Sequence, residues 1–101
     1  MTDTRVLDPL GRAIMLHDRT WFGHILKAHP EMDQCRALVE RALADPGEIR
    51  LSRSDPDCRI YFGPGPRTGV MMMVVVDVVV CLVKTAHMAR QASGGTQEWS
   101  K

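Results

Sequence analysis

The sequence predicts an α+β domain in which an N-terminal hairpin and two helices pack on a roughly four-stranded antiparallel sheet. Three observations lead to this fold class. Between residues 19 and 44, apolar residues recur every three or four positions, which is the spacing of a helix face. From residue 49 onwards the apolar period changes to two, which is typical of strands. Helices followed by strands along a chain favour helices gathered on one face of an antiparallel sheet.

The composition is that of a single small globular domain, compact over about residues 5–90 with a flexible C-terminal tail over 90–101. The chain has 101 residues, is 45% apolar and 25% charged, and carries a formal net charge of +1. This near-neutral balance counts against a general nucleic-acid coat protein but does not exclude a local basic patch. Three widely spaced cysteines without a C-x-x-C motif predict free thiols in a reducing compartment. With no signal-peptide pattern at the N-terminus, we expect a cytoplasmic protein.

The first elements are a hairpin and a helix. Two short apolar runs at residues 5–7 and 12–16 flank the turn-rich Asp8-Pro9-Leu10-Gly11, which predicts a hairpin. Asp18 is then well placed to cap a helix over residues 19–28. The expected buried face of that helix consists of Trp21, Phe22, Ile25, Leu26 and Ala28.

A second helix is predicted from about residue 30 to residue 44. Pro30 disfavours helical geometry at His29 and itself suits a first helical position. The Asp45-Pro46-Gly47 sequence ends the helix. Its apolar stripe is Met32, Cys35, Leu38, Val39, Ala42 and Leu43.

Strands follow over about residues 49–52 and 58–62, separated by a turn. Residues 70–86 are almost entirely apolar, and as one strand they would measure roughly 56 Å, too long for a domain of this size. We therefore expect two strands, about 70–76 and 79–86, with the turn near Asp77. The apolar run contains the charged side chain of Asp77, and it is too short to span a bilayer. Trp99, in the loose tail, is either an anchor or an exposed residue.

The histidines are the first candidates for chemistry. The Pro30 break can bring His29 and Glu31 beside His24, and a histidine with a nearby carboxylate is a plausible proton-transfer unit near neutral pH. The alternative is structural, with His29 capping the second helix and His24 packing half-buried. His87 ends the last strand, where a polar cluster either marks the rim of a site or simply leaves the core.

A group of cationic and polar side chains on neighbouring strands is the second candidate. Such a patch can hold a phosphate through charge-assisted hydrogen bonds, but the solvated face of a sheet has the same pattern. The group consists of Arg50, Arg53, Arg59 and Tyr61. No histidine or carboxylate has the spacing of a known metal motif, so no metal is predicted, and no nucleotide-hydrolase or common hydrolase motif occurs.

The order of these features resembles a known family. It runs from Asp8-Pro9-Leu10-Gly11-Arg12 through the element W-x-x-H-I-L-x-x-H-P-E, which begins at Trp21, and Asp45-Pro46 to a valine-rich strand closing on Lys84-Thr85-Ala86-His87. From about residue 5 to residue 90, the chain resembles the phage and bacterial group of barnase/EndoU/colicin-tRNase/RelE-like (BECR-fold) nuclease domains. That group's architecture has N-terminal helices packed on a four-stranded antiparallel sheet.

The resemblance implies a metal-independent endoribonuclease without a cofactor, found as a toxin or a prophage-encoded protein. RNA is the implied substrate, and an immunity or antitoxin protein is the second implied partner. The same fold without catalysis would instead be a protein-interaction module. The catalytic residues implied in this chain are His24, His29, Glu31 and His87. The implied phosphate- or RNA-binding residues are Arg53, Arg59, Lys84 and Thr85.

Overall fold

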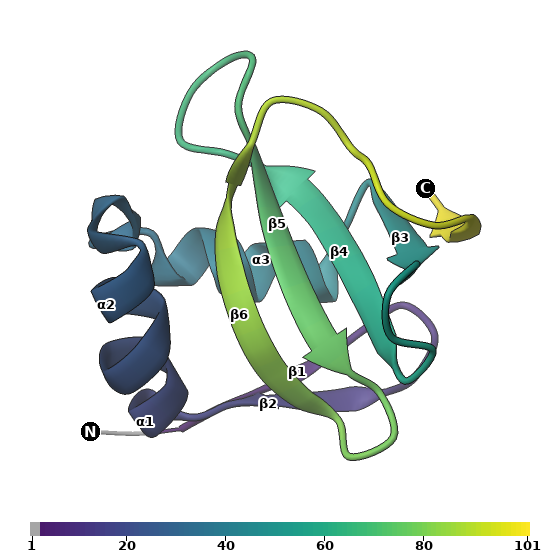
Figure 1. Cartoon of the computed structure of the whole chain (residues 1–101), viewed down its shortest axis with the longest axis horizontal. Coiled ribbons are helices and arrows are strands. Elements are labelled where there is room, and N and C mark those ends of the chain that lie inside the picture. Colours follow the sequence, from purple (N-terminus) through teal and green to yellow (C-terminus); the bar gives the residue numbers. More distant parts are fainter. Residues whose placement is uncertain (1–2) are drawn as a thin grey trace.

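The computed structural model describes residues 3–101, and its strands form one sheet with short helical segments beside it (Figure 1). The strands are β1 (Thr4–Leu7), β2 (Ala13–Leu16), β3 (Glu48–Leu51), β4 (Cys58–Pro64), β5 (Met71–Asp77), β6 (Leu82–Ala89) and β7 (Gln97–Ser100). The helical segments are α1 (Asp18–Thr20), η1 (Trp21–Ile25), α2 (Leu26–Ala28), η2 (Pro30–Met32) and α3 (Arg36–Ala44).

The predicted four-stranded antiparallel sheet with two packed helices is wrong. The sheet has seven strands in the order β1-β2-β6-β5-β4-β3-β7 and curves into a half-barrel. It is mixed, because β2 runs parallel to β6 with Met15 opposite Leu82, while the other pairs are antiparallel. The predicted hairpin forms, but it extends the sheet beyond β6. An apolar strand pattern does not specify its partner strand, and so this addition was not visible in the sequence.

The helical part is shorter and less regular than predicted. Residues 18–28 form one helical stretch with a π turn in the middle, where the N–H of Leu26 donates to the carbonyl of Trp21. The residue preceding this stretch is His17, so Asp18 is not the cap; it lies in the first turn, buried, with Oδ1 2.7 Å from Nη1 of Arg36.

The second helix begins six residues later than predicted, at Arg36 rather than residue 30. Residues 30–32 form only a 3₁₀ turn, and Gln34 then adopts a positive φ of 71°. Met32 and Cys35 are nevertheless both buried. The 3₁₀ turn therefore buries apolar residues at the same sequence spacing as one continuous helix would. This explains why the sequence predicted a longer helix.

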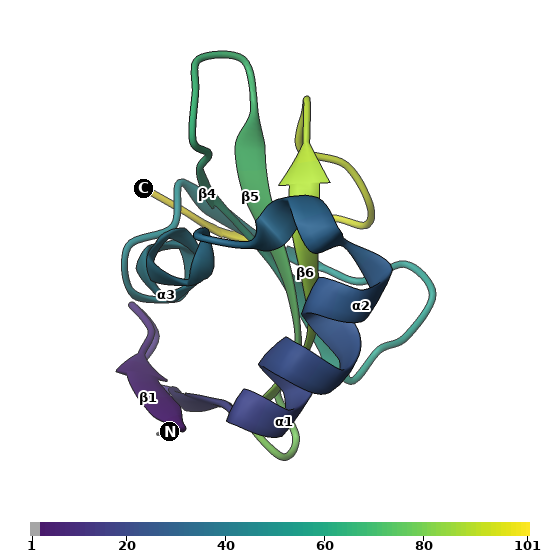
Figure 2. The ribbon, with the colours of Figure 1, turned by 90° about the vertical axis from the view of Figure 1, so that its left-hand side faces the viewer.

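The hydrophobic core lies between the concave face of the sheet and α3 (Figure 2). Met72, Val74 and Val76 of β5 point into this core. Gly63 of β4 packs directly under α3, because a Cβ at this position would come within 2.8 Å of Ala42. The helical stretch 18–28 lies beside β6, as Figures 1 and 2 both show. Its buried residues are Asp18, Trp21 and Ile25, whereas the predicted core residue Phe22 is 51% exposed.

The predicted fold-back of the valine-rich segment does occur. Strand β5 ends at Asp77, whose Oδ1 accepts the N–H of Val79 at 3.0 Å and the N–H of Val80 at 3.4 Å. The turn is completed by Cys81 with a φ of 57°, so β6 starts three residues later than the predicted strand 79–86. Cys81 thus occupies the left-handed position that glycine or asparagine normally fills, while Asp77 accepts the N–H groups of the turn.

The opposite face of the sheet, turned away from α3, is called the outer face below. The segment over residues 90–96 crosses it between β6 and β7 (Figure 1), and Gly94 lies against Ile60 of β4. The C-terminal residues, for which the sequence predicted a loose tail, pair as β7 with β3. Trp99 is half-buried and packs against the core, so of the two alternatives it is an anchor.

Gly95 is a specific requirement for β7. It has a φ of +50°, and a Cβ would lie 1.5 Å from the carbonyl oxygen of Leu51. We expect Gly95→Ala to lower the free energy of unfolding by at least about 2 kcal/mol in urea titrations, because the segment must shift away from β3. Gly23→Ala is the matched control: that site has open space, and the change should be neutral or slightly stabilising. Equal unfolding midpoints for both variants would contradict the pairing of β7.

Candidate functional site

Two histidines from distant parts of the chain lie together where α2 meets β6. His29 follows α2, and His87 lies near the end of β6 on the outer face, opposite Met73 of β5. Their ring centroids are 5.2 Å apart and the ring planes are inclined by 33°. Both residues are half-buried, so solvent reaches them while the surrounding elements hold them. Pro30 keeps His29 out of helical geometry and so helps to turn it towards β6.

The surroundings of the two rings differ. Nδ1 of His87 lies 3.0 Å from the carbonyl oxygen of Met88, which only accepts, so Nδ1 carries the hydrogen and Nε2 of the neutral ring has a free lone pair. Nδ1 of His29 lies 3.7 Å from Oε2 of Glu31, a separation for an ion pair rather than a hydrogen bond. The pair thus combines an acceptor nitrogen on one ring with a carboxylate beside the other.

A polar cavity of about 330 Å³ lies further along β6. It holds three of the predicted site residues, His24, Lys84 and Thr85. Thr85 and His87 are two residues apart on the same face of β6, roughly 7 Å, so the cavity and the histidine pair share one side of this strand. The other lining residues are Ser52, Ser54, Asp55, Cys58 and Val75.

The charged side chains that line the cavity pair only weakly with each other. Lys84 Nζ lies 3.8 Å from Oδ2 of Asp55, and both side chains are about half exposed, so this ion pair is weak. The backbone N–H of Asp57 and the thiol of Cys58 donate to Asp55, and they lower the pKa of its carboxyl. Burial and the hydrogen bond to Asp55 raise the pKa of the Cys58 thiol, so this cysteine is not an activated nucleophile.

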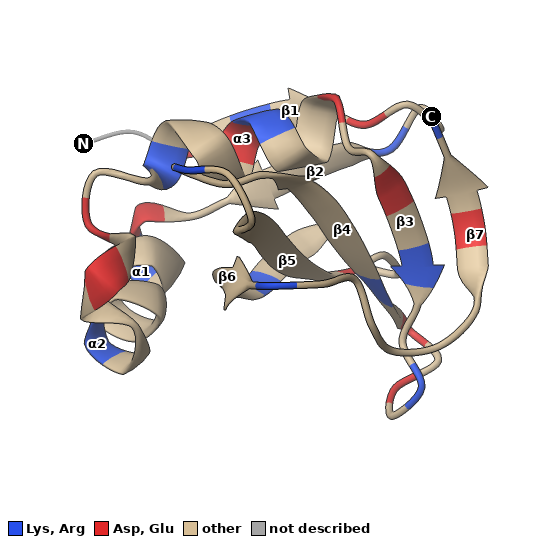
Figure 3. Ribbon diagram, turned by 90° about the horizontal axis from the view of Figure 1, so that it is seen from above, with Lys and Arg blue, Asp and Glu red and all other residues tan. Residues whose placement is uncertain are grey.

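The predicted arginine patch does not join this site. Arg59 is on the core side of β4, where Nε is 2.7 Å from Oε2 of Glu98 and Nη1 donates to the carbonyls of Pro56 and Cys58. Tyr61, on the same side, is fully buried. Arg53 is exposed in the loop 52–57, between two serines of the cavity, and has no ion pair among residues 3–101. Acidic and basic residues are interspersed along the coloured part of the ribbon rather than gathered by sign (Figure 3).

Arg50 is the fourth member of that patch, and it lies on the outer face of β3. Its Nε is 3.0 Å from Oε2 of Glu48. A cation already paired in this way is not free to hold a phosphate, so the solvated-face alternative fits this residue better.

The sequence missed a polar network, centred on the buried side chains of Asp8 and Tyr61, that joins three parts of the sheet. Tyr61 and Arg12 both donate to Oδ2 of Asp8, Arg12 also reaches Oε1 of Glu98 at 2.8 Å, and Glu98 accepts from Arg59. The network therefore ties the β1–β2 turn to β4 and β7. The only signal for it was the Asp-Pro-Leu-Gly turn, whose aspartate also accepts the N–H of Leu10 and of Arg12.

This network shifts the pKa values of its members. Burial alone would raise the pKa of Asp8, but the hydrogen bonds from Tyr61 and Arg12 outweigh it and lower that pKa. Burial and the acceptor Asp8 raise the pKa of Tyr61. The pKa of Glu98 is lowered by hydrogen bonds from Arg12 and Arg59, against the effect of burial. All of these shifts hold the groups in their normal ionisation states at neutral pH, which indicates a structural role.

Within residues 3–101, no group of three or more histidine, cysteine or acidic side chains could hold a metal ion. Over the same residues, none of the helices has the length and apolar character needed to cross a membrane. No protein-family model, curated protein or solved structure matches this chain.

Proposed function

We propose that this protein is a small metal-independent endoribonuclease of the cytoplasm that uses His29 and His87 as its acid–base pair. The single observation that carries the proposal is the 5.2 Å contact between the rings of these histidines, which come from different elements. Two imidazoles that are solvent-accessible and fixed in place can exchange protons with a substrate near neutral pH. The resemblance of the sequence to the BECR-fold nucleases points to the same chemistry.

In the proposed reaction, Nε2 of His87 removes the proton of a ribose 2′-hydroxyl. The 2′-oxygen then attacks the adjacent phosphorus, the bond to the 5′-oxygen breaks, and His29 donates a proton to that leaving oxygen. Glu31, whose Oε2 lies 3.7 Å from Nδ1 of His29, faces the ring of the proposed acid. The products are a 2′,3′-cyclic phosphate and a free 5′-hydroxyl, and no metal or redox partner is needed.

We assign stabilisation of the transition state to the cavity next to the histidines. Charge develops on the phosphate oxygens, and fixed donors near them stabilise it. Lys84 and Thr85 are two of the donors that line the cavity, and the weak pair with Asp55 leaves the Lys84 ammonium available. His24 lines the same cavity and is exposed, so we assign it to substrate binding rather than to proton transfer. Arg53, which lies beside the cavity and has no ion pair within residues 3–101, would contact a flanking phosphate.

The test is cleavage of RNA by the wild-type chain, with and without EDTA. We expect cleavage that survives chelation and leaves 2′,3′-cyclic phosphate ends, identified by mass spectrometry of the fragments. A single 2′-deoxy substitution at the cleaved nucleotide should abolish the cut at that position, because the nucleophile is then missing. Failure to cleave tRNA, rRNA and mRNA, or cleavage at the 2′-deoxy position, would disprove the proposal.

The second candidate is a non-catalytic protein-interaction module. It is favoured by the exposed apolar turn between β5 and β6, where Val79 is 70% and Val80 is 59% exposed. Exposed apolar side chains at a hydrogen-bonded turn can insert into a groove of a partner protein. If this protein is a toxin, an immunity or antitoxin protein would be such a partner. If the chain binds a protein partner through this turn but cleaves no RNA, the result supports the interaction module and contradicts the ribonuclease.

A further inference from the structure

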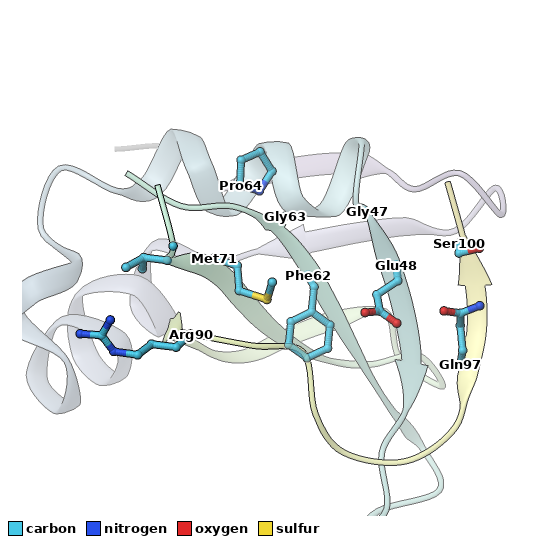
Figure 4. A pocket seen from close by; sticks show the side chains of 11 residues that line it. Gly47, Glu48, Phe62, Gly63, Pro64, Met71, Arg90, Gln97 and Ser100 are labelled. Carbon is cyan, nitrogen blue, oxygen red and sulfur yellow. The ribbon is translucent and has the colours of Figure 1, made fainter. Parts of the chain in front are cut away.

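A groove of about 550 Å³ opens on the outer face, where β4 ends and β5 begins (Figure 4). Phe62 and Met71 lie side by side in its middle, Arg90 lies at one end, and Glu48 and Gln97 lie at the other. The predicted sites do not include this groove. Its lining combines an apolar centre with a cation and with hydrogen-bonding groups at the ends.

The groove lies on the same face of the sheet as the histidine pair. The strand register places Glu48, Phe62 and Met73 in one row of cross-strand neighbours, and His87 is the next member of that row. Adjacent strands lie about 4.8 Å apart, so Phe62 and His87 are separated by roughly 10 Å. A nucleic-acid strand held at the histidines therefore has a neighbouring nucleotide within reach of the groove.

The charges around the groove suit a polyanion. Arg90 is exposed, and so is Arg67 in the β4–β5 turn; neither forms an ion pair within residues 3–101. The two line a smaller adjoining cavity of about 190 Å³ and share Val70 as a wall residue with the groove. The carboxylate of Glu48 is balanced by Arg50, with Oε2 3.0 Å from Nε. The net charge at this end of the sheet is thus positive.

We propose that the groove is a nucleobase subsite for the nucleotide flanking the cleaved bond, with Arg90 and Arg67 contacting the adjoining phosphate. This inference rests on the proposed ribonuclease function and adds a substrate-binding site to it. Met71, which is half-buried, packs against the base, because every base has an apolar face, and Phe62, which is 2% exposed, lies beside Met71 and supports it. Glu48, whose Oε1 has no hydrogen-bond partner within residues 3–101, and Gln97 form hydrogen bonds to the base edge. An apolar peptide would use the centre of the groove but would leave the two arginines without partners.

The experiment measures binding of a labelled hexanucleotide in which every ribose is 2′-O-methylated, so that no 2′-hydroxyl is present and cleavage cannot occur. An abasic version of the same probe reports the backbone contribution alone. Met71→Gln, a neutral change of similar size, should weaken binding of the base-bearing probe about tenfold and leave binding of the abasic probe nearly unchanged. Leu7→Gln, at a residue 65% exposed on β1, is the matched control and should affect neither probe.

Arg90→Ala tests the phosphate contact separately. It should weaken binding of both probes and reduce the slope of log K against log salt by about 0.7, the value for one lost phosphate contact on a single strand. Arg41→Ala removes an exposed arginine from α3, on the other side of the sheet, and should leave the slope unchanged. Circular dichroism of each variant checks that the fold is intact.

The outcomes separate this inference from the proposed function. In one outcome, the wild type cleaves unmodified RNA, but wild type and Met71→Gln bind the base-bearing probe equally well. This result would disprove the nucleobase subsite and would still support the proposed ribonuclease. Base-dependent binding that is lost in Met71→Gln, without any cleavage by the wild type, would support the groove and disprove the ribonuclease.

Discussion

Replacing His87 by alanine should lower the rate of RNA cleavage about a hundredfold or more, the usual contribution of one acid or base to proton transfer. His29→Ala should have a similar effect. The two residues act in one step, so the double variant should be little slower than either single variant. The wild-type rate should depend on pH as a bell-shaped curve, since one imidazole must be neutral and the other protonated. Each variant should lose one arm of this curve.

His17→Ala is the control for this prediction. His17 precedes α1 and bonds through Nδ1 to Asp3 at 2.9 Å, so it takes no part in the proposed site. The His17→Ala variant should cleave RNA at the wild-type rate. His24→Ala should weaken substrate binding, with a raised KM and a smaller effect on kcat, because His24 lines the cavity, whereas the ring contact joins His29 and His87. Full cleavage by a folded His87→Ala variant would rule out the acid–base role.

Asp8→Asn should destabilise the fold by about 2 kcal/mol, because it removes the buried carboxylate to which Tyr61 and Arg12 donate. The side chain of Asp8 is fully buried and accepts from Tyr61, Arg12 and two backbone N–H groups. An amide of the same shape presents a donor where Tyr61 and Arg12 also donate. Urea unfolding at pH 7, compared with the exposed control Asp33→Asn, measures the loss. Equal unfolding free energies for the two variants would contradict a structural role for the network.

The same network predicts how stability depends on pH. The folded pKa of Asp8 is below its unfolded value, which is about 3.9, so the unfolded chain binds more protons as the pH falls. The stabilisation is complete above the unfolded pKa and is lost as the pH falls through the folded pKa. The lowered pKa of Glu98 acts in the same direction. The difference between wild type and Asp8→Asn should therefore be constant from pH 5 to pH 7 and shrink below about pH 4.

Local patterns were sufficient for much of the secondary structure. The Asp8–Gly11 turn, the break at Pro30 and the fold-back near Asp77 depend on residues within a few positions of each other, and all three occur in the structure. The sequence also singled out His29 and His87, because a polar residue at the end of an apolar element stands out against its neighbours. Their roles stay predictions until cleavage is measured.

The tertiary structure alone decided which strands pair and which side chains meet. Hairpin and tail strands could join the sheet at either edge or not at all, since backbone hydrogen bonds carry no sequence information; packing placed β2 beside β6 and β7 beside β3. The same packing paired Arg59 with Glu98, brought Ser52 and Asp55 to the cavity and opened the groove at Met71. Turns and periodicity are local properties and can be read along the chain, whereas contacts between remote residues depend on how all elements fit together in space.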